Sequence, residues 1–181
     1  MFSFYSNSQA ESAPSTGRDT SAPAQFFAGW FDIIVQEDER NYILDCYTEN
    51  TELTDVLYDA MEAYIAGDKS EGDAKMSDTK PLFKTAFADC GELKDQMDAW
   101  SKKFDDLTKR DDWAIISQLI YEENKDVIDR DMDLELREWK QGVYFNSGMF
   151  AGQLIKVFLD NYQGKSNDAE QPEAYMYLLP F

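Results

Sequence analysis

The sequence predicts an all-α fold: a single-domain bundle of about five or six amphipathic helices with extended N- and C-terminal tails. Apolar residues recur at steps of three and four along most of the chain, which is the spacing of one face of an α-helix. Only 5 prolines and 9 glycines occur in 181 residues, so long helices can run without interruption. With 43% hydrophobic residues, among them 12 Phe and 10 Tyr, the chain has enough apolar surface for one core.

Composition divides the chain into three parts. Residues 1–22 are rich in Ser, Thr, Ala, Pro and Gly, which predicts a low-complexity tail. Residues 23–162 carry the helical periodicity and predict the bundle domain, which Pro23 opens because proline suits the first turn of a helix. Residues 163–181 predict a polar linker followed by an apolar docking tail.

Three helical segments are predicted before residue 67. The first has a dense apolar stripe over residues 26–35, and the second is a short amphipathic segment over residues 42–47. Asn50 or Thr51 is expected to cap the third segment because both side chains can accept a hydrogen bond from the first turn. Gly67 is expected to end it, since glycine adopts the left-handed conformation that terminates many helices.

One long helix is predicted next, after a loop. Residues 67–79 combine glycines with scattered charged side chains, which predicts an exposed acidic loop. Pro81 then opens the helix. Its apolar stripe is Phe83, Phe87, Cys90, Leu93, Met97, Trp100, Phe104 and Leu107.

Two further helices complete the predicted bundle. Asp111 or Asp112 is expected to cap the first, and a shift in the apolar phase predicts a break near Glu123–Asn124. The inward residues of the first of these helices are Trp113, Ile116, Leu119 and Ile120. A single closing helix then runs to Gly164, with Asp131 facing water. Its apolar face is Ile128, Met132, Leu136, Trp139, Val143, Phe150, Leu154 and Val157.

Aromatic residues and glycines gather in the closing helix and predict a helix-packing motif. Gly148 and Gly152 lie four residues apart, so they share one face of a helix. Each glycine inside a helix costs roughly 1 kcal/mol relative to alanine, which indicates a packing reason for keeping two. We expect an earlier helix, the one that carries Cys90, to approach this face. The motif comprises Trp139, Gly142, Tyr144, Phe145, Gly148 and Gly152.

Two cysteines, Cys46 and Cys90, lack the spacing of a zinc site or of a thioredoxin-like motif. Each lies on a predicted apolar stripe. They are either two small buried hydrophobic residues or a disulfide that joins two helices. A disulfide would restrict the unfolded chain by about 4 kcal/mol in the chain-entropy model, and it would indicate an oxidising compartment.

The charge balance limits the expected partners. The chain has 36 acidic and 17 basic residues, a formal net charge of -19. This field repels phosphate groups, and no basic patch offsets it, so we expect no nucleic-acid binding and no attraction to anionic membrane surfaces. No apolar run reaches about 18 residues, so no transmembrane segment is predicted.

Catalytic and metal-binding signatures are not evident. Histidine is absent, which removes imidazole metal ligands and histidine-activated nucleophiles. The segment from Asp129 begins like a calcium loop, but Leu134 occupies the glycine position and Lys140 the glutamate position. We therefore predict no metal, no cofactor and no enzyme activity. Acid–base catalysis by a carboxylate would require an acid held among apolar residues. The candidates for such an acid are Glu138, beside Trp139, and Asp89, beside Cys90.

The segment at residues 174–181 reads Ala-Tyr-Met-Tyr-Leu-Leu-Pro-Phe. Such an apolar segment is predicted to be covered, because exposed apolar patches commonly mark interaction sites. It either tucks into a groove between the helices or docks on a partner chain. The docking residues are Tyr175, Met176, Tyr177, Leu178, Leu179 and Phe181.

The order of these motifs is Phe26-Phe27-x-Gly29, then Cys46 and Cys90, then the Trp139–Gly152 motif. It resembles a large, mostly uncharacterised group of small helical proteins from ciliates, over residues 26–159. Relatives in that group share two helix-borne cysteines and a closing Trp-x-x-Gly-Asp-Tyr-x-x-Ala-Gly type of motif. This chain has Val and Ser at the Asp and Ala positions. Because many relatives look secreted or lumenal, the resemblance implies a disulfide.

The predicted function is that of a non-catalytic structural or accessory protein in a larger assembly, which binds partner chains through its terminal tails. The alternative is a helical protein that binds lipid or another hydrophobic ligand between its aromatic-rich helices. The N-terminal residues lack the basic and apolar regions of an intact signal peptide. A disulfide-permissive compartment, either secretory or extracellular or the mitochondrial intermembrane space, is slightly favoured over the cytoplasm.

Overall fold

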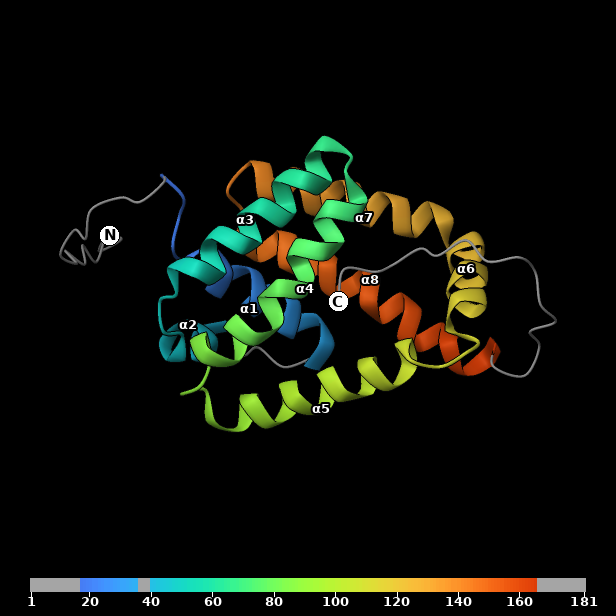
Figure 1. Ribbon diagram of the computed structural model, residues 1–181, viewed down its shortest axis with the longest axis horizontal. Coiled ribbons are helices and arrows are strands. Elements are labelled where there is room, and N and C mark those ends of the chain that lie inside the picture. Colours follow the sequence, from blue (N-terminus) through green and yellow to red (C-terminus); the bar gives the residue numbers. More distant parts are fainter. Residues whose placement is uncertain (1–16, 36–39, 166–181) are drawn as a thin grey trace, which may run out of the picture.

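The structure is a computed structural model that describes residues 17–35 and 40–165 (Figure 1). Within these ranges the regular structure is entirely helical, which confirms the all-α prediction, although eight helices form where five or six were expected. The helices are α1 (Ala22–Val35), α2 (Arg40–Cys46), α3 (Thr51–Ala66), α4 (Lys69–Ala86), α5 (Gly91–Thr108), α6 (Trp113–Glu123), α7 (Lys125–Lys140) and α8 (Tyr144–Lys165).

Helices α1 and α8, from opposite ends of the described chain, pack side by side and form the most extensive helix pair (Figure 1). Two helix hairpins complete the larger part of the fold. Helices α3 and α4 form one, α7 and α8 form the other, and α6 packs across α8 at the far end of the molecule. Helix α5 lies along the lower edge of the view in Figure 1.

The expected ends of α3 are confirmed in detail. The side-chain oxygen of Asn50 accepts a hydrogen bond from the Leu53 amide at 2.9 Å, which satisfies one of the free donors of the first turn. Gly67 ends the helix with φ at 83°, a conformation that costs glycine nothing sterically. Only Gly67 and Asp68 separate α3 from α4, so the two helices are forced into a tight hairpin.

The acidic loop predicted over residues 67–79 is wrong, because this segment forms the first half of α4. Asp68 caps the helix by accepting a hydrogen bond from the Glu71 amide at 3.0 Å. Gly72, which suggested a loop, is buried under the ring of Tyr64, where a Cβ would lie 2.4 Å from the ring. The helix was missed because its packing against α3 uses glycine and threonine in place of a continuous apolar stripe.

Two helices predicted to be continuous are each broken by a turn. The predicted helix over residues 81–107 divides into α4, with Pro81 inside it, and α5, which begins at Gly91 with φ at 45°. The predicted closing helix divides at Gly142, where φ is 73°, into α7 and α8. Val143, expected to be buried, lies in this turn and is 38% exposed. Met132, also expected to be buried, is 37% exposed because α7 buries the neighbouring face, which carries Ile128, Asp131, Glu135 and Trp139.

The core has one large and two smaller clusters. The large cluster lies between α1, α3, α4 and the adjoining ends of α7 and α8, and it includes Phe26, Phe31, Leu57 and Met61, all fully buried. A second cluster around Ile116 and Ile120 joins α6 to α7 and α8, and a third joins α1 to α8. No helix among the described residues has the length and apolar character required to cross a membrane.

Candidate functional site

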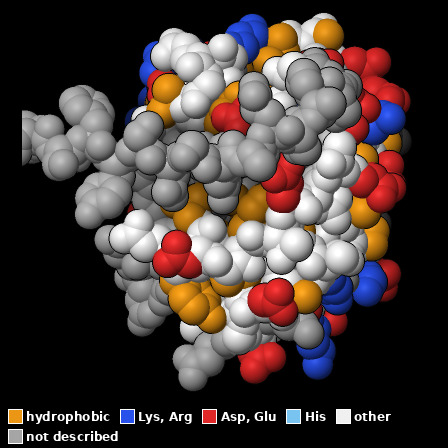
Figure 2. All heavy atoms as spheres, turned by 90° about the vertical axis from the view of Figure 1, so that its left-hand side faces the viewer, with side chains coloured by type: hydrophobic (Ala, Val, Ile, Leu, Met, Phe, Trp, Pro, Cys, Tyr) orange, Lys and Arg blue, Asp and Glu red, His pale blue; other side chains and the backbone are white. Residues whose placement is uncertain are grey.

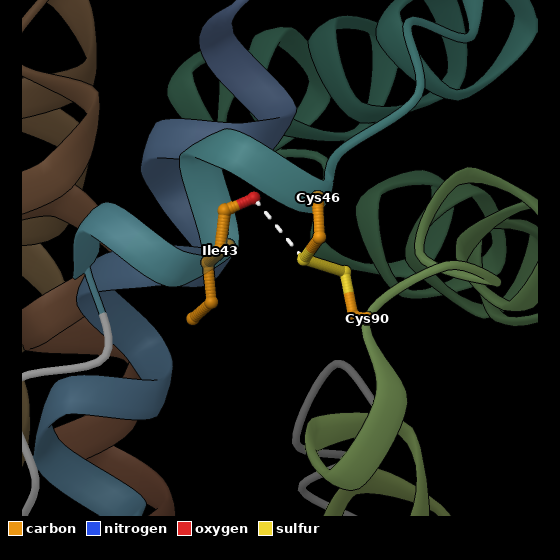
Figure 3. The surroundings of a disulfide bond; sticks show 3 residues. All are labelled: Ile43, Cys46 and Cys90. Carbon is orange, nitrogen blue, oxygen red and sulfur yellow. Dashed lines mark hydrogen bonds between the residues drawn. A yellow bond between two sulfur atoms is a disulfide. The ribbon is translucent and has the colours of Figure 1, made fainter.

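Cys46 and Cys90 form a disulfide, with their Cα atoms 5.1 Å apart (Figure 3). Of the two alternatives that the sequence left open, the structure therefore supports the bonded pair. The bond ties the C-terminal end of α2 to the turn between α4 and α5. A backbone hydrogen bond from the Thr48 amide to the Ala86 carbonyl, at 2.8 Å, joins the same two regions. The two contacts hold the short helix α2 against the end of α4.

The aromatic part of the packing motif lies where α1, α3, α7 and α8 meet. Trp139, 5% exposed, lies in the last turn of α7, and its ring centroid is 5.8 Å from that of Phe26 on α1 and 5.0 Å from that of Tyr58 on α3. Tyr144 begins α8 at 4.9 Å from the same indole, and its hydroxyl lies 2.6 Å from the Tyr58 hydroxyl. Gly142 supplies the turn that brings the two helix ends together.

The glycines of the motif lie at the crossing of α1 and α8. A Cβ built on Gly148 would lie 1.8 Å from the Phe26 carbonyl oxygen, and one built on Gly29 would lie 1.9 Å from the Phe145 carbonyl oxygen. Gly152 is less tightly enclosed, with 2.9 Å to the Trp30 carbonyl oxygen. The helix that approaches this face is therefore α1, and the expectation that the helix with Cys90 does so is wrong.

Arg18 forms a charged cluster that the sequence did not predict. Its Nη2 donates to Asp59 at 2.7 Å and to Glu62 at 3.3 Å, and its Nη1 lies 3.3 Å from the Asp55 carboxylate. These three acids follow a spacing of four and three, so they share one face of α3. Burial lowers the pKa of Arg18, but the hydrogen bond to Asp59 and the nearby charges outweigh it and raise that pKa.

The Arg18 guanidinium also lies over the ring of Tyr58, 5.3 Å from its centroid. An open cleft of about 630 Å³ adjoins this cluster and is lined by Gly17, Arg18, Asp55, Tyr58, Asp59 and Glu62. Figure 2 shows the face at this end of the molecule, where acidic side chains are scattered and basic side chains gather toward the rims.

Two acidic residues of α7 are buried. Asp131, predicted to face water, is 2% exposed and pairs with the neighbouring Arg130 at 2.7 Å. Glu135, one turn later, is 7% exposed, and desolvation raises the pKa of its carboxyl from 4.5 to about 8. Tyr64 lies near it on α3, where burial and a hydrogen bond to Asp73 raise the pKa of the Tyr64 hydroxyl. The burial of both acids was not predicted, because apolar periodicity assigns only apolar residues to the buried face of a helix.

The two carboxylates considered for acid–base catalysis lie elsewhere. Asp89 is exposed in the turn after α4. Glu138 accepts hydrogen bonds from Arg137 at 2.9 Å and Asn146 at 3.3 Å, which lower the pKa of its carboxyl. That direction is opposite to the one a general acid requires.

The remaining predicted residues are not placed by the structure. The C-terminal docking residues of 175–181 and most of the low-complexity tail, residues 1–16, lie outside the described residues. Among the described residues, no group of three or more Cys, Asp or Glu side chains is arranged to hold a metal ion. Comparison of the chain with protein-family models, with curated proteins and with solved structures finds no match.

Proposed function

We propose that this chain is a non-catalytic structural or accessory protein that presents its terminal segments to partner chains from a rigid helical body. One observation carries the proposal: the helix that follows the N-terminal segment, α1, and the helix that precedes the C-terminal segment, α8, cross with their backbones in close contact. A partner held by either segment would therefore be attached to a closely packed helix pair.

The chemistry of the segments and of the surface supports protein partners. Residues 175–181 are apolar and follow a polar linker. An apolar groove on a partner chain would cover them. The formal net charge of -19 favours a partner with a neutral or basic surface and opposes nucleic acid.

The experiment compares assembly size in cells of the protein's own source. Tagged full chain should migrate on native gels well above the size of the single chain. Replacement of Tyr175, Tyr177 and Leu178 with serine should return it to the single-chain size without changing its melting temperature. Tyr42→Ser removes an exposed aromatic from α2 and serves as the matched control. A wild-type chain that migrates alone would refute the proposal. Lipid carried by that lone chain in native mass spectrometry would favour the hydrophobic-ligand alternative.

Localisation and family membership are further parts of the proposal. The disulfide is compatible with an oxidising compartment, either secretory or mitochondrial intermembrane space. Trapping free thiols with an alkylating reagent during cell lysis, followed by intact-mass measurement, would show whether the bond exists in the cell.

Membership in the ciliate group predicts that the structure of a second member of the group has the same close crossing of its first and last helices.

A further inference from the structure

We propose that residues 17–21, here called the Arg18 strap, form a latch that Arg18 alone holds shut and that opens without unfolding the helices. The strap precedes α1 and lies against the acidic face of α3. The inference concerns the isolated chain, so it stands or falls independently of whether residues 1–16 bind a partner.

The guanidinium supplies the strong contacts of the strap. It makes ion pairs with Asp55, Asp59 and Glu62 at 2.7–3.3 Å, and Nη1 also donates to the Asp55 backbone carbonyl at 3.0 Å. The Arg18 side chain is 19% exposed, less than any of its three acidic partners. Bonds of this kind, with charge on both donor and acceptor, are stronger than neutral hydrogen bonds.

The remaining contacts of the strap with α3 and its neighbourhood are few and neutral. The Asp19 amide donates to the Tyr58 hydroxyl at 3.2 Å, and the Tyr47 hydroxyl donates to the Thr20 carbonyl at 3.4 Å. The strap itself contains no apolar side chain, so it buries no hydrophobic surface that could offset the entropy of ordering it. Loss of the guanidinium should therefore release the strap from α3.

Both ends of the strap suit a movable segment. At its start, Gly17 has φ at 73°, and a Cβ built there would meet nothing within 4 Å, so the chain can change direction freely. At its end, Asp19 accepts hydrogen bonds from the Ser21 amide and hydroxyl, and its carbonyl accepts one from the Ala22 amide. Those bonds lie at the start of α1 and do not involve α3. The strap can thus swing away while α1 stays intact.

Salt should control the latch because charge holds it shut. The screening length falls from about 30 Å at 0.01 M salt to about 3 Å at 1 M. The three acidic partners are 39–63% exposed, so ions reach them readily. We expect high salt to open the strap in the wild-type chain, and the α1–α8 crossing, which is held by backbone contact, to be unaffected.

Hydrogen–deuterium exchange on the full-length protein tests the latch, with Arg18→Gln as the variant. Exchange in peptides that cover residues 17–22 should become about tenfold faster, while peptides from α8 stay unchanged. Lys75→Gln is the matched control, because Lys75 lies 4.0 Å from the same Asp59 carboxylate but has no contact with the strap. Arg18→Lys should give an intermediate rate, since an ammonium cannot reach three carboxylates as the guanidinium fork does.

Two comparisons decide the outcome. Raising the salt from 0.01 M to 1 M should speed strap exchange in the wild type and should not speed it in Arg18→Gln, where the charge left on the strap, that of Asp19, has the same sign as the α3 acids and is not attracted to them. Equal rates in Arg18→Gln and Lys75→Gln, or a wild-type strap that ignores salt, would overturn the proposal. So would faster exchange throughout α8 in Arg18→Gln, because Arg18 would then stabilise the fold as a whole.

Discussion

Replacement of Gly148 by alanine should strongly destabilise the protein, although the same change inside most helices is stabilising. A Cβ at this position would lie 1.8 Å from the Phe26 carbonyl oxygen, whereas real Cβ atoms are essentially never found closer than 3.0 Å to such a neighbour. The obstructing atom belongs to a backbone and cannot rotate away. Helices α1 and α8 must therefore separate locally by at least the shortfall of 1.2 Å.

The expected size follows from two opposing effects. Overpacking of a well-packed interior costs about 1–3 kcal/mol, and the upper end applies here because a whole helix pair must shift. Alanine gains up to about 1 kcal/mol over glycine in a helix. Gly152→Ala makes the same exchange in the same helix, but its Cβ would be 2.9 Å from the Trp30 carbonyl oxygen, so a small adjustment relieves it. The helix-propensity gain cancels between the two variants, which leaves Gly148→Ala less stable by about 2 kcal/mol.

Urea unfolding followed by far-ultraviolet circular dichroism measures this difference. Both variants should keep the wild-type m-value, so that the midpoints report stability alone. Free energies of unfolding that agree within about 0.5 kcal/mol for the two variants would show that the backbones of α1 and α8 are not in contact at Gly148.

Four further changes test other parts of the structure. The folded-state pKa of Glu135 lies at about 8, above its unfolded value of 4.5, so the free energy of unfolding should fall by up to about 5 kcal/mol as the pH rises from about 4.5 to 8. Glu135→Gln should remove this fall and be the more stable protein above pH 8 in urea titrations, and an unchanged pH profile would contradict the assignment. Reduction of the Cys46–Cys90 bond, which spans 44 residues, should cost about 4 kcal/mol in the same assay, and the double alanine variant should not respond to reductant. Asn50→Ala should cost about 1 kcal/mol through loss of the α3 cap, and no loss would show that water replaces the cap. Ser147→Ala should stabilise the protein by about 1 kcal/mol, because the buried Ser147 hydroxyl has no hydrogen-bond partner, and a loss of stability would reveal one.

Local signals in the sequence predicted much of the helical structure. Asn50 was one of the two residues predicted to cap α3, Gly67 was predicted to end it, and the phase shift at Glu123–Asn124 separated α6 from α7. These predictions succeeded because capping and periodicity depend on neighbours within a few residues. The turns at Gly91 and Gly142 were missed for the same reason. Apolar spacing continues through both turns, and the positive φ angles that break the helices leave no trace in that spacing.

The candidate site was less predictable because its members come from distant parts of the chain. Arg18 lies in the segment predicted to be a low-complexity tail, and its three acidic partners on α3 belong to a generally acidic sequence, so nothing in the sequence paired them. The choice between a bonded and an unbonded pair of cysteines also required the position of α2 relative to the turn before α5.

The amino-acid sequence by itself determined the helical class, the capped helix α3 and the glycine face of α8, because these follow from residue propensities and from spacing along one helix. The tertiary structure decided which helix meets that face. Gly29 on α1 supplies the complementary gap, and its pairing with Gly148 depends on the path of the chain between residues 35 and 144. Tertiary structure likewise buried Asp131 and Glu135 on α7, because the position of α7 against α3 and α8 sets which of its residues lose contact with water.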